Sequence, residues 1–143
     1  MPATRVLFVC LGNACRSPMA EALARHLGPE VIEASSAGLV ALGYIAGPTQ
    51  AVLDENGIAS QGLVSKSLRT IDLSGIDLVV NLAGRPIEKH LDGRALPVED
   101  WEVGDPFGSD LAVYRRIRDE IERRVVDLIE RLRGSEQSAT AAE

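Results

Sequence analysis

The 143-residue sequence is short of aromatic residues, cysteines and long apolar runs, and each shortage excludes a class of function. Aromatic residues make up 3% of the chain, which is too few for a stacking platform that binds single-stranded nucleic acid. Two cysteines in a chain of this length do not make a disulfide framework. No apolar run approaches the ~18 residues of a membrane helix, so we expect no membrane-spanning segment.

Positive charge is also scarce. With 15 lysines and arginines against 21 acidic residues, the net charge is -6, which argues against nucleic acid or an anionic membrane as the main partner. The N-terminus lacks a basic segment followed by an apolar stretch and a small-residue cleavage site, so the sequence predicts no signal peptide. We expect a cytoplasmic protein, a monomer with a single aliphatic core.

A stretch near the start of the chain predicts a strand, a tight polar loop and a helix in succession. Residues 6–9, Val-Leu-Phe-Val, are typical of a strand that is covered on both faces. Ser17 fits a helix N-cap, Pro18 the first helical position, and Glu21 the acid of a capping box. The loop of residues 10–17, which we call the cradle, therefore ends on a helix N-terminus, where its backbone N–H groups can curl around an anion.

Two side chains make the cradle a candidate reaction centre. Cys10 lies at its base, and Arg16 lies at its rim, where a guanidinium can bind two oxygens of an anion at once. The helix N-terminus, the Arg16 cation and the Ser17 hydroxyl favour the thiolate form of Cys10, which is a nucleophile near neutral pH. A strand-end cysteine alone is more often a small core residue, and Gly12-Asn13 alone a plain turn, but their combination with Arg16 favours the reaction centre.

The residues from Val9 to Glu21, VCLGNACRSPMAE, resemble the phosphate loop of the low-molecular-weight protein tyrosine phosphatases, a superfamily shared with thiol-dependent arsenate reductases. The shorter Cys-x5-Arg pattern from Cys10 to Arg16 is weak by itself. The resemblance implies a single α/β domain, a three-layer α/β/α sandwich with a central four-stranded parallel sheet. It also implies catalysis by Cys10 and Arg16 and a substrate contact from each residue of the loop: Leu11, Gly12, Asn13, Ala14, Cys15, Arg16 and Ser17.

Alternating strand and helix patterns along the rest of the chain agree with such a sheet. Strands are predicted over 5–10, 31–37, 77–82 and 94–98, and helices over 18–27, 48–56, 86–91 and 109–133. Residues 1–133 are therefore predicted as a single phosphatase-like domain, and residues 134–143, which are small and polar, as a disordered tail. Because ligands bind beyond the carboxyl ends of parallel strands, the strand end at Cys10 suits a functional site.

Two later motifs supply the other residues that the resemblance implies. Ser36, in Ser-Ala-Gly, matches the serine that supports the phosphate loop by hydrogen bonding. Asp105, in Asp105-Pro106-Phe107, matches the general acid that protonates the leaving oxygen, with Phe107 as a supporting aromatic residue. Taken alone, Ser36 fits a strand-to-loop turn and Asp-Pro a simple turn. We call residues 103–108 the acid loop.

The implied reaction has two steps and needs no cofactor and no metal. Cys10 attacks phosphorus while Arg16 and the cradle hold the equatorial oxygens, and Asp105 protonates the leaving group. Asp105 then activates the water that releases phosphate from the cysteinyl-phosphate. Cys15 does not have a zinc-binding spacing to Cys10. It is either a redox partner that forms a reversible disulfide with Cys10, as in similar phosphatases, or a small residue that fits the loop.

Arsenate has the shape and charge of phosphate, so an arsenate reductase is the alternative enzyme. Residues 65–68, 77–80 and 118–121 resemble that branch of the superfamily. Thioredoxin-coupled members use two further cysteines after the third strand, and residues 81–91 contain none here. A reductase would therefore need a small-molecule thiol such as glutathione or mycothiol.

Substrate preference and a role without catalysis are also open. Phosphotyrosine-specific members have aromatic walls around the site, whereas the acid loop has only Phe107 and residues 39–47 have only Tyr44. The sequence therefore predicts phosphate monoester chemistry, with a phosphorylated substrate or an oxyanion such as phosphate or arsenate as the partner. A silent phosphate-binding module is a further alternative, against which the intact Cys10, Arg16 and Asp105 speak.

Overall fold

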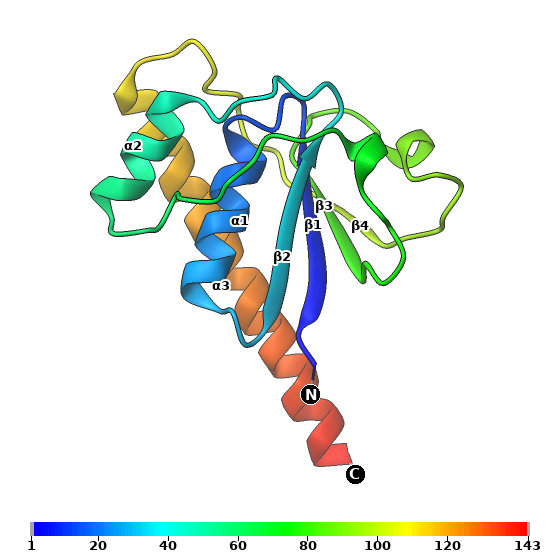
Figure 1. Ribbon diagram of the computed structural model, residues 1–143. Helices are drawn as coiled ribbons and strands as arrows, with labels where there is room; N and C mark the ends of the chain where they lie inside the picture. Colours follow the sequence, from blue (N-terminus) through cyan, green and yellow to red (C-terminus); the bar gives the residue numbers. More distant parts are fainter. Residues whose placement is uncertain (1, 143) are drawn as a thin grey trace.

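A four-stranded parallel sheet forms the centre of the molecule (Figure 1). The computed structural model describes residues 2–142, with side chains described through residue 135. The strands are β1 Thr4–Cys10, β2 Ile32–Gly38, β3 Leu78–Asn81 and β4 Val98–Asp100. They lie in the order β2-β1-β3-β4, and each pair of neighbours is parallel. The predicted α/β class and four-stranded parallel sheet are confirmed.

Three α-helices lie on one side of the sheet and two short 3-10 helices lie on the other (Figure 1). Val6 and Phe8 of β1 point to the α-helical side and Leu7 and Val9 to the other side, because side chains alternate along a strand. The third layer of the predicted sandwich therefore consists of the 3-10 helices and the loops around them. The helices are α1 Arg16–Leu27, α2 Gly47–Glu55, α3 Leu111–Ala142, η1 Leu68–Thr70 and η2 Glu88–His90.

Residues 94–97 and residues 86–91 differ from the sequence predictions. β4 begins at Val98 rather than at residue 94, because Pro97 has no N–H and joins the sheet only through its carbonyl, which accepts a hydrogen bond from Val79. The segment 86–91, predicted as a helix, contains only the single 3-10 turn of η2. A segment this short cannot offset the cost of starting an α-helix.

α3 extends further than predicted. It continues to Ala142, through the residues that the sequence predicts as a disordered tail, and residue 143 lies outside the described residues. Once a helix has started, each further residue adds a hydrogen bond, and the alanine, glutamate and glutamine residues here are good helix formers. None of the helices within residues 2–142 has the length and apolar character to cross a membrane.

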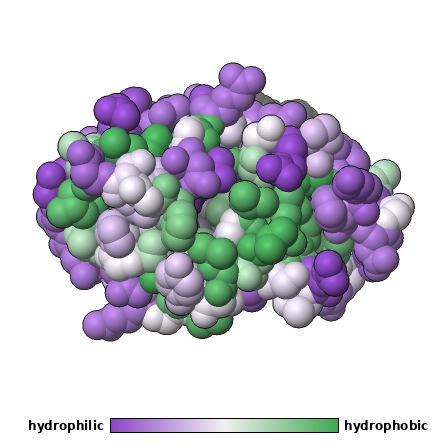
Figure 2. Space-filling view, turned by 90° about the horizontal axis from the view of Figure 1, so that it is seen from above, coloured by the Kyte–Doolittle hydropathy of each residue, from purple (hydrophilic) through white to green (hydrophobic). Residues whose placement is uncertain are grey.

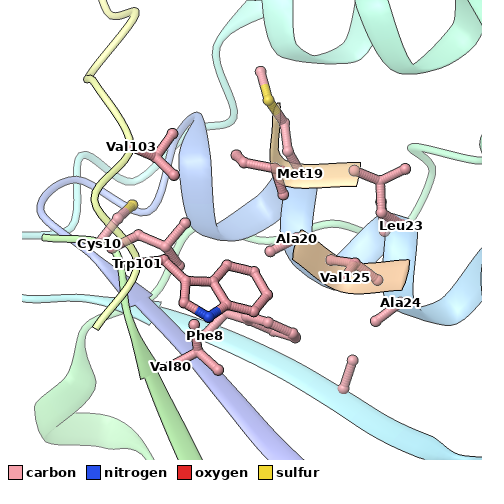
Figure 3. Close-up of a cluster of buried hydrophobic side chains, with 14 of the residues drawn as sticks. Phe8, Cys10, Met19, Ala20, Leu23, Ala24, Val80, Trp101, Val103 and Val125 are labelled. Carbon is pink, nitrogen blue, oxygen red and sulfur yellow. The ribbon is translucent and has the colours of Figure 1, made fainter. Parts of the chain in front are cut away.

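The larger of the two apolar clusters lies between the sheet and the α-helices and fixes the position of β1 (Figure 3). In it, Phe8 packs against Trp101 with ring centroids 5.8 Å apart, beneath Met19 and Leu23 of α1. Cys10 lies at the end of β1, where the carboxyl ends of the strands meet. Figure 2 views this end of the molecule from above, and apolar side chains gather near the middle of the face.

Candidate active site

The cradle joins the end of β1 to the start of α1, and the helix begins earlier than predicted. α1 starts at Arg16, with Cys15 as its N-cap residue and no side-chain cap. Ser17 is therefore not the N-cap, and the prediction was wrong because its hydroxyl is used elsewhere. It lies 2.9 Å from the Cys10 thiol, in the buried base of the cradle. A hydroxyl at this distance can donate a hydrogen bond to a Cys10 thiolate.

The N–H groups of the cradle are left free to bind a ligand. Among the described residues, no carbonyl or side chain accepts a hydrogen bond from the N–H groups of residues 11–17. Those at the start of α1 also carry the partial positive charge of a helix N-terminus. A set of unpartnered N–H groups around a buried thiol has the arrangement of donors that an anion-binding site requires.

A neighbouring loop holds the cradle carbonyls outward. The N–H groups of Leu39, Val40 and Leu42 donate to the carbonyls of residues 10–12, at 3.0, 2.8 and 2.9 Å respectively. The Ser65 hydroxyl also donates to the last of these carbonyls, at 3.3 Å. In a trans peptide the carbonyl and the following N–H point in opposite directions, so these bonds turn the N–H groups of residues 11–13 inward.

Close packing between the cradle and β2 requires a glycine at position 38. A Cβ atom there would lie 2.8 Å from the Asn13 nitrogen and 2.8 Å from the Leu11 carbonyl oxygen, closer than real Cβ contacts allow. Asn13 itself has a φ of 48°, in the left-handed region, where asparagine is tolerated better than most residues. The backbone of the cradle is therefore fixed by steric fit as well as by hydrogen bonds.

A buried polar network supports Asn13 from beneath. Its side-chain amide donates to the Ser17 hydroxyl at 2.8 Å and to the Ser36 hydroxyl at 3.0 Å, and its carbonyl oxygen accepts from Lys66 N–H at 2.8 Å. Ser36 in turn donates to Glu21, which forms no capping box and instead lies buried behind the cradle. Ser36 is thus hydrogen-bonded to the cradle as the acceptor of a bond from the Asn13 amide.

Arg16 is held by backbone carbonyls through one nitrogen of its guanidinium, and its Nε is left without a partner in the described part of the chain. Its Nη1 donates to the carbonyls of Leu82, at 2.6 Å, and Val103, at 3.2 Å, which fixes the plane of the guanidinium. Its Nη2 lies 3.4 Å from Asp105 Oδ2. Its Nε is buried and has no partner among the described residues. A buried donor without a partner is costly, so this side chain is arranged to bind an acceptor that is not part of the chain.

The acid loop lies across a cavity of about 280 Å³ from the cradle. The Asp105 side chain is 43% exposed, and its other oxygen, Oδ1, accepts a hydrogen bond from Phe107 N–H at 3.1 Å. The structure therefore brings Cys10, Arg16 and Asp105 to one cavity. Its remaining wall includes the exposed side chains of Val40, Leu42 and Phe107, which we call the apolar rim.

Cys15 is a buried free thiol of the cradle and is among the residues that line the cavity. Burial raises the pKa of this thiol, and its Sγ lies 3.4 Å from the Tyr114 hydroxyl of α3. Cys10 is free as well, so the redox and the space-filling interpretations of Cys15 both stay open. Among residues 2–135, whose side chains the structure describes, no group of three or more histidine, cysteine or acidic residues is arranged to hold a metal ion.

The sequence predictions of site residues did not include the residues that position Arg16 or two residues that line the cavity, Val40 and Leu42. Leu82 and Val103 act through backbone carbonyls, which every residue has, so their identity gives no signal. Val40 and Leu42 are exposed apolar residues in a loop, and single apolar residues of this kind are common on protein surfaces, so their identity also gives little signal. That exposure is visible only once the fold is known.

The fold and the site together define a class of enzyme. A cysteine at the end of a parallel strand, beneath unpartnered N–H groups and beside a fixed arginine, is suited to attack the central atom of a tetrahedral oxyanion. The low molecular weight phosphotyrosine protein phosphatase family matches residues 5–138. The chain belongs to this family.

Relatives of this chain carry the names of two kinds of enzyme. It is 33% identical to the glutaredoxin arsenate reductase of Synechocystis sp., over 90% of this chain and 98% of the relative. It is 35% identical to the protein-arginine-phosphatase of Geobacillus stearothermophilus, over 90% of this chain and 95% of the relative. A solved structure titled as an arsenate reductase in the phosphate binding state superposes with a TM-score of 0.81, at 32% identity, over 90% of this chain and 98% of that chain.

Proposed function

We propose that this protein is a cysteine-dependent phosphate monoester hydrolase that works through a cysteinyl-phosphate intermediate. The observation that carries the proposal is the combination of three features at one cavity. These are the Cys10 thiol beneath the free N–H groups, the unpartnered Nε of Arg16, and the Asp105 carboxyl facing them. Membership of a phosphatase family supports the same function.

In the first step the Cys10 sulfur attacks phosphorus, and the bond from phosphorus to the leaving oxygen breaks. The cradle N–H groups and Arg16 bind the equatorial oxygens, where negative charge is held in the transition state. Protonated Asp105 gives its proton to the leaving oxygen. In the second step Asp105 takes a proton from water, the water oxygen attacks phosphorus, the sulfur–phosphorus bond breaks, and phosphate leaves.

The apolar rim supports a substrate whose leaving group is apolar. Val40 is 66% exposed and Phe107 is 50% exposed, and the charged side chains of the cavity wall are Arg16 and Asp105, which are committed to the reaction. Apart from these two, no side chain of this wall carries a hydroxyl, amide or charged group that could bind the hydroxyl groups of a sugar phosphate. We expect an aryl phosphate to be hydrolysed with a higher kcat/KM than glucose 6-phosphate.

Arsenate reduction is the second candidate, favoured by the likeness to arsenate reductases over most of the chain. Cys10 would form a covalent arsenate adduct with loss of water. One small-molecule thiol would then attack the Cys10 sulfur, so that arsenite leaves with two electrons and a mixed disulfide forms. A second thiol would reduce that disulfide. Glutathione or mycothiol would supply both thiols, because residues 81–91 contain no cysteine.

Two assays run side by side test these functions. The first measures turnover of p-nitrophenyl phosphate by the wild type and by Cys10→Ser. The second measures arsenite formed from arsenate in the presence of glutathione or mycothiol. Aryl phosphate turnover that is lost in Cys10→Ser is the expected result. Thiol-dependent arsenite formation without aryl phosphate turnover would replace the hydrolase with the reductase, and the absence of both would leave a binding module.

We further infer that the reaction takes place in the cytoplasm on a monomer, with a phosphorylated compound as the partner. A catalytic thiol must stay reduced, and the cytoplasm is a reducing compartment. The net charge of -6 disfavours nucleic acid as a partner. Light scattering at several protein concentrations tests the monomer, and a mass that rises with concentration would contradict it.

A further inference from the structure

The Ala14 carbonyl faces away from the cavity and accepts two hydrogen bonds from the start of α2. Ala46 N–H donates at 3.1 Å and the Thr49 hydroxyl donates at 2.9 Å. Thr49 lies in the first turn of α2 and is fully buried, at 0% exposure. A buried hydroxyl needs a partner, so this contact fixes the position of the carbonyl as well as that of the side chain.

The Ala14 carbonyl controls the direction of the next N–H group. The carbonyl of Ala14 and the N–H of Cys15 belong to one planar peptide, which is trans. When the carbonyl is held against α2, the N–H points the opposite way, toward the cavity. Cys15 N–H has no acceptor among the described residues. It is therefore one of the donors available to a bound anion.

We propose that Thr49 is a positioning residue of the cradle, which acts through the Ala14 carbonyl to aim the Cys15 N–H at the anion. This inference rests on the proposed function in one respect, which is that the anion is taken to be the phosphate group that reacts. Phosphate or arsenate bound without reaction would use the same donor. Leu39, Val40 and Leu42 hold the carbonyls of residues 10–12 through backbone N–H groups, which a substitution does not remove. Thr49 holds the Ala14 carbonyl through a fully buried side chain, so a substitution of Thr49 can test this contact.

Three variants isolate the Thr49 hydroxyl. Thr49→Val keeps the volume and removes the hydroxyl, and Thr49→Ser keeps the hydroxyl and removes a methyl group. Thr70→Val is the matched control, because the Thr70 hydroxyl also donates to a backbone carbonyl, that of Ser67 at 2.7 Å, but at the exposed η1 helix. The measurements are the Kd of inorganic phosphate by calorimetry, and kcat and KM for p-nitrophenyl phosphate.

We expect Thr49→Val to weaken phosphate binding and to lower kcat/KM, each by about tenfold, which is the scale of one lost hydrogen bond. Thr49→Ser and Thr70→Val should stay close to the wild type in both measurements. A merely structural threonine would lower the unfolding temperature of Thr49→Val without changing the Kd of phosphate in the folded protein. That result would overturn the proposal, as would a loss of phosphate binding that Thr49→Ser shares.

Two further outcomes are distinguishable. If Thr49→Val does not unfold cooperatively, Thr49→Ala replaces it as the variant without a hydroxyl, and the same comparison with Thr49→Ser decides. A wild type that binds phosphate without hydrolysing the ester would overturn the hydrolase function alone, and the Kd values would still decide the role of Thr49. A wild type that does not bind phosphate at all would overturn both.

Discussion

The cradle and the acid loop face each other across one cavity, yet they are held in opposite ways. At the base of the cradle, the side chains of Cys10, Asn13 and Ser17 are almost entirely buried. The carbonyls of residues 10–12 accept hydrogen bonds from a neighbouring loop. In the acid loop, Asp105 is 43% exposed and is fixed by one hydrogen bond from Phe107 N–H and one ion pair with Arg16. The first is a rigid receptor, and the second is an open segment that reaches over it.

This difference matches the tasks that the two regions have in the proposed reaction. Electrostatic stabilisation of a transition state depends on donors that are already in position, because donors that must reorganise lose much of their effect. An acid that later becomes a base must meet a leaving group in one step and a water molecule in the next. Rigidity suits the first task and exposure suits the second. We therefore expect substitutions in the cradle to have larger effects than substitutions in the acid loop.

The largest effect is expected for Cys10→Ser. A serine hydroxyl is a much weaker nucleophile than a cysteine sulfur, so kcat/KM for p-nitrophenyl phosphate should fall by at least about 10⁴-fold. Phosphate binding should persist, because the N–H groups of the cradle are unchanged. Steady-state kinetics and calorimetry measure the two quantities. Residual turnover near that of the wild type would contradict a role for Cys10 as nucleophile.

Arg16→Lys is expected to lower kcat/KM by about 10³-fold. A lysine retains the charge but cannot contact Leu82 and Val103 and also present a second donor to the anion. The same p-nitrophenyl phosphate assay measures the loss. Arg116→Lys is the control, since Arg116 is an exposed residue of α3 that forms no ion pair among the described residues. If Arg16→Lys is as active as this control, a positive charge at position 16 is sufficient for catalysis and the guanidinium geometry is not required.

Asp105→Asn is expected to cost about 10²-fold in kcat for phenyl phosphate. The loss should be smaller for p-nitrophenyl phosphate, whose leaving group needs little help from a proton. A series of aryl phosphates with leaving groups of different acidity measures this trend. An equal loss across the series would assign Asp105 to substrate binding and remove the distinction between the acid loop and the cradle.

Ser36→Ala tests whether the network beneath the cradle matters to its rigidity. Asn13 and Glu21 would each lose a buried hydrogen-bond partner, so we expect a loss of stability of about 1–3 kcal/mol and a KM for p-nitrophenyl phosphate raised by up to about tenfold. Urea unfolding and kinetics measure the two effects. Ser74→Ala is the control, because Ser74 also donates to a carboxylate but at the exposed surface. If KM does not change, the hydrogen-bond network beneath the cradle has no effect on substrate binding in the site.

The smallest effect concerns the ion pairs that join α2, behind the cradle, to α3, which follows the acid loop. Hydrogen bonds from Arg115 and Arg118 lower the pKa of Glu55 to about 2. A carboxyl whose pKa is lowered by folding stabilises the protein above its ordinary pKa of 4.5, and this stabilisation is lost as the pH falls through about 2. Glu55→Gln should therefore lower Tm slightly at pH 7 and not at all below pH 2.

A matched control for this prediction is Glu122→Gln, because Glu122 of α3 forms no ion pair among the described residues. Its Tm should follow that of the wild type at every pH. Thermal unfolding at several pH values measures both variants. A Tm difference for Glu55→Gln that persists below pH 2 would show that the ion pairs are not its cause.

The sequence predicts the strand, the cradle and the first helix because their determinants are local. Apolar strand residues, a Gly-Asn pair and a helix start all lie within residues 6–21. The details that were wrong depend on side-chain contacts that form only when the chain has folded. Ser17 and Glu21 fit helix-capping positions by spacing, but the structure uses them for Cys10 and Ser36. A side chain with two possible partners is assigned by tertiary contacts, which spacing alone does not contain.

The placement of Asp105 beside Arg16 also depends on tertiary contacts rather than on local sequence. Its sequence context gives a turn, and only the resemblance to a known family suggested an acid. The ion pair at 3.4 Å arises because Val103, two residues earlier, accepts a hydrogen bond from the same guanidinium. The contacts of Leu82 and Val103 with Arg16 could not be predicted, since a backbone carbonyl has no sequence signal.

The unpartnered N–H groups of residues 11–17 have a consequence for the lifetime of the protein. N–H donors that no group of the chain satisfies lower the stability of the native state when no anion is bound. An anion that binds the native state and not the unfolded chain restores it, by about 2.7 kcal/mol at a concentration of 100 times its Kd. The resistance of this protein to proteolysis would then rise and fall with the phosphate or arsenate around it.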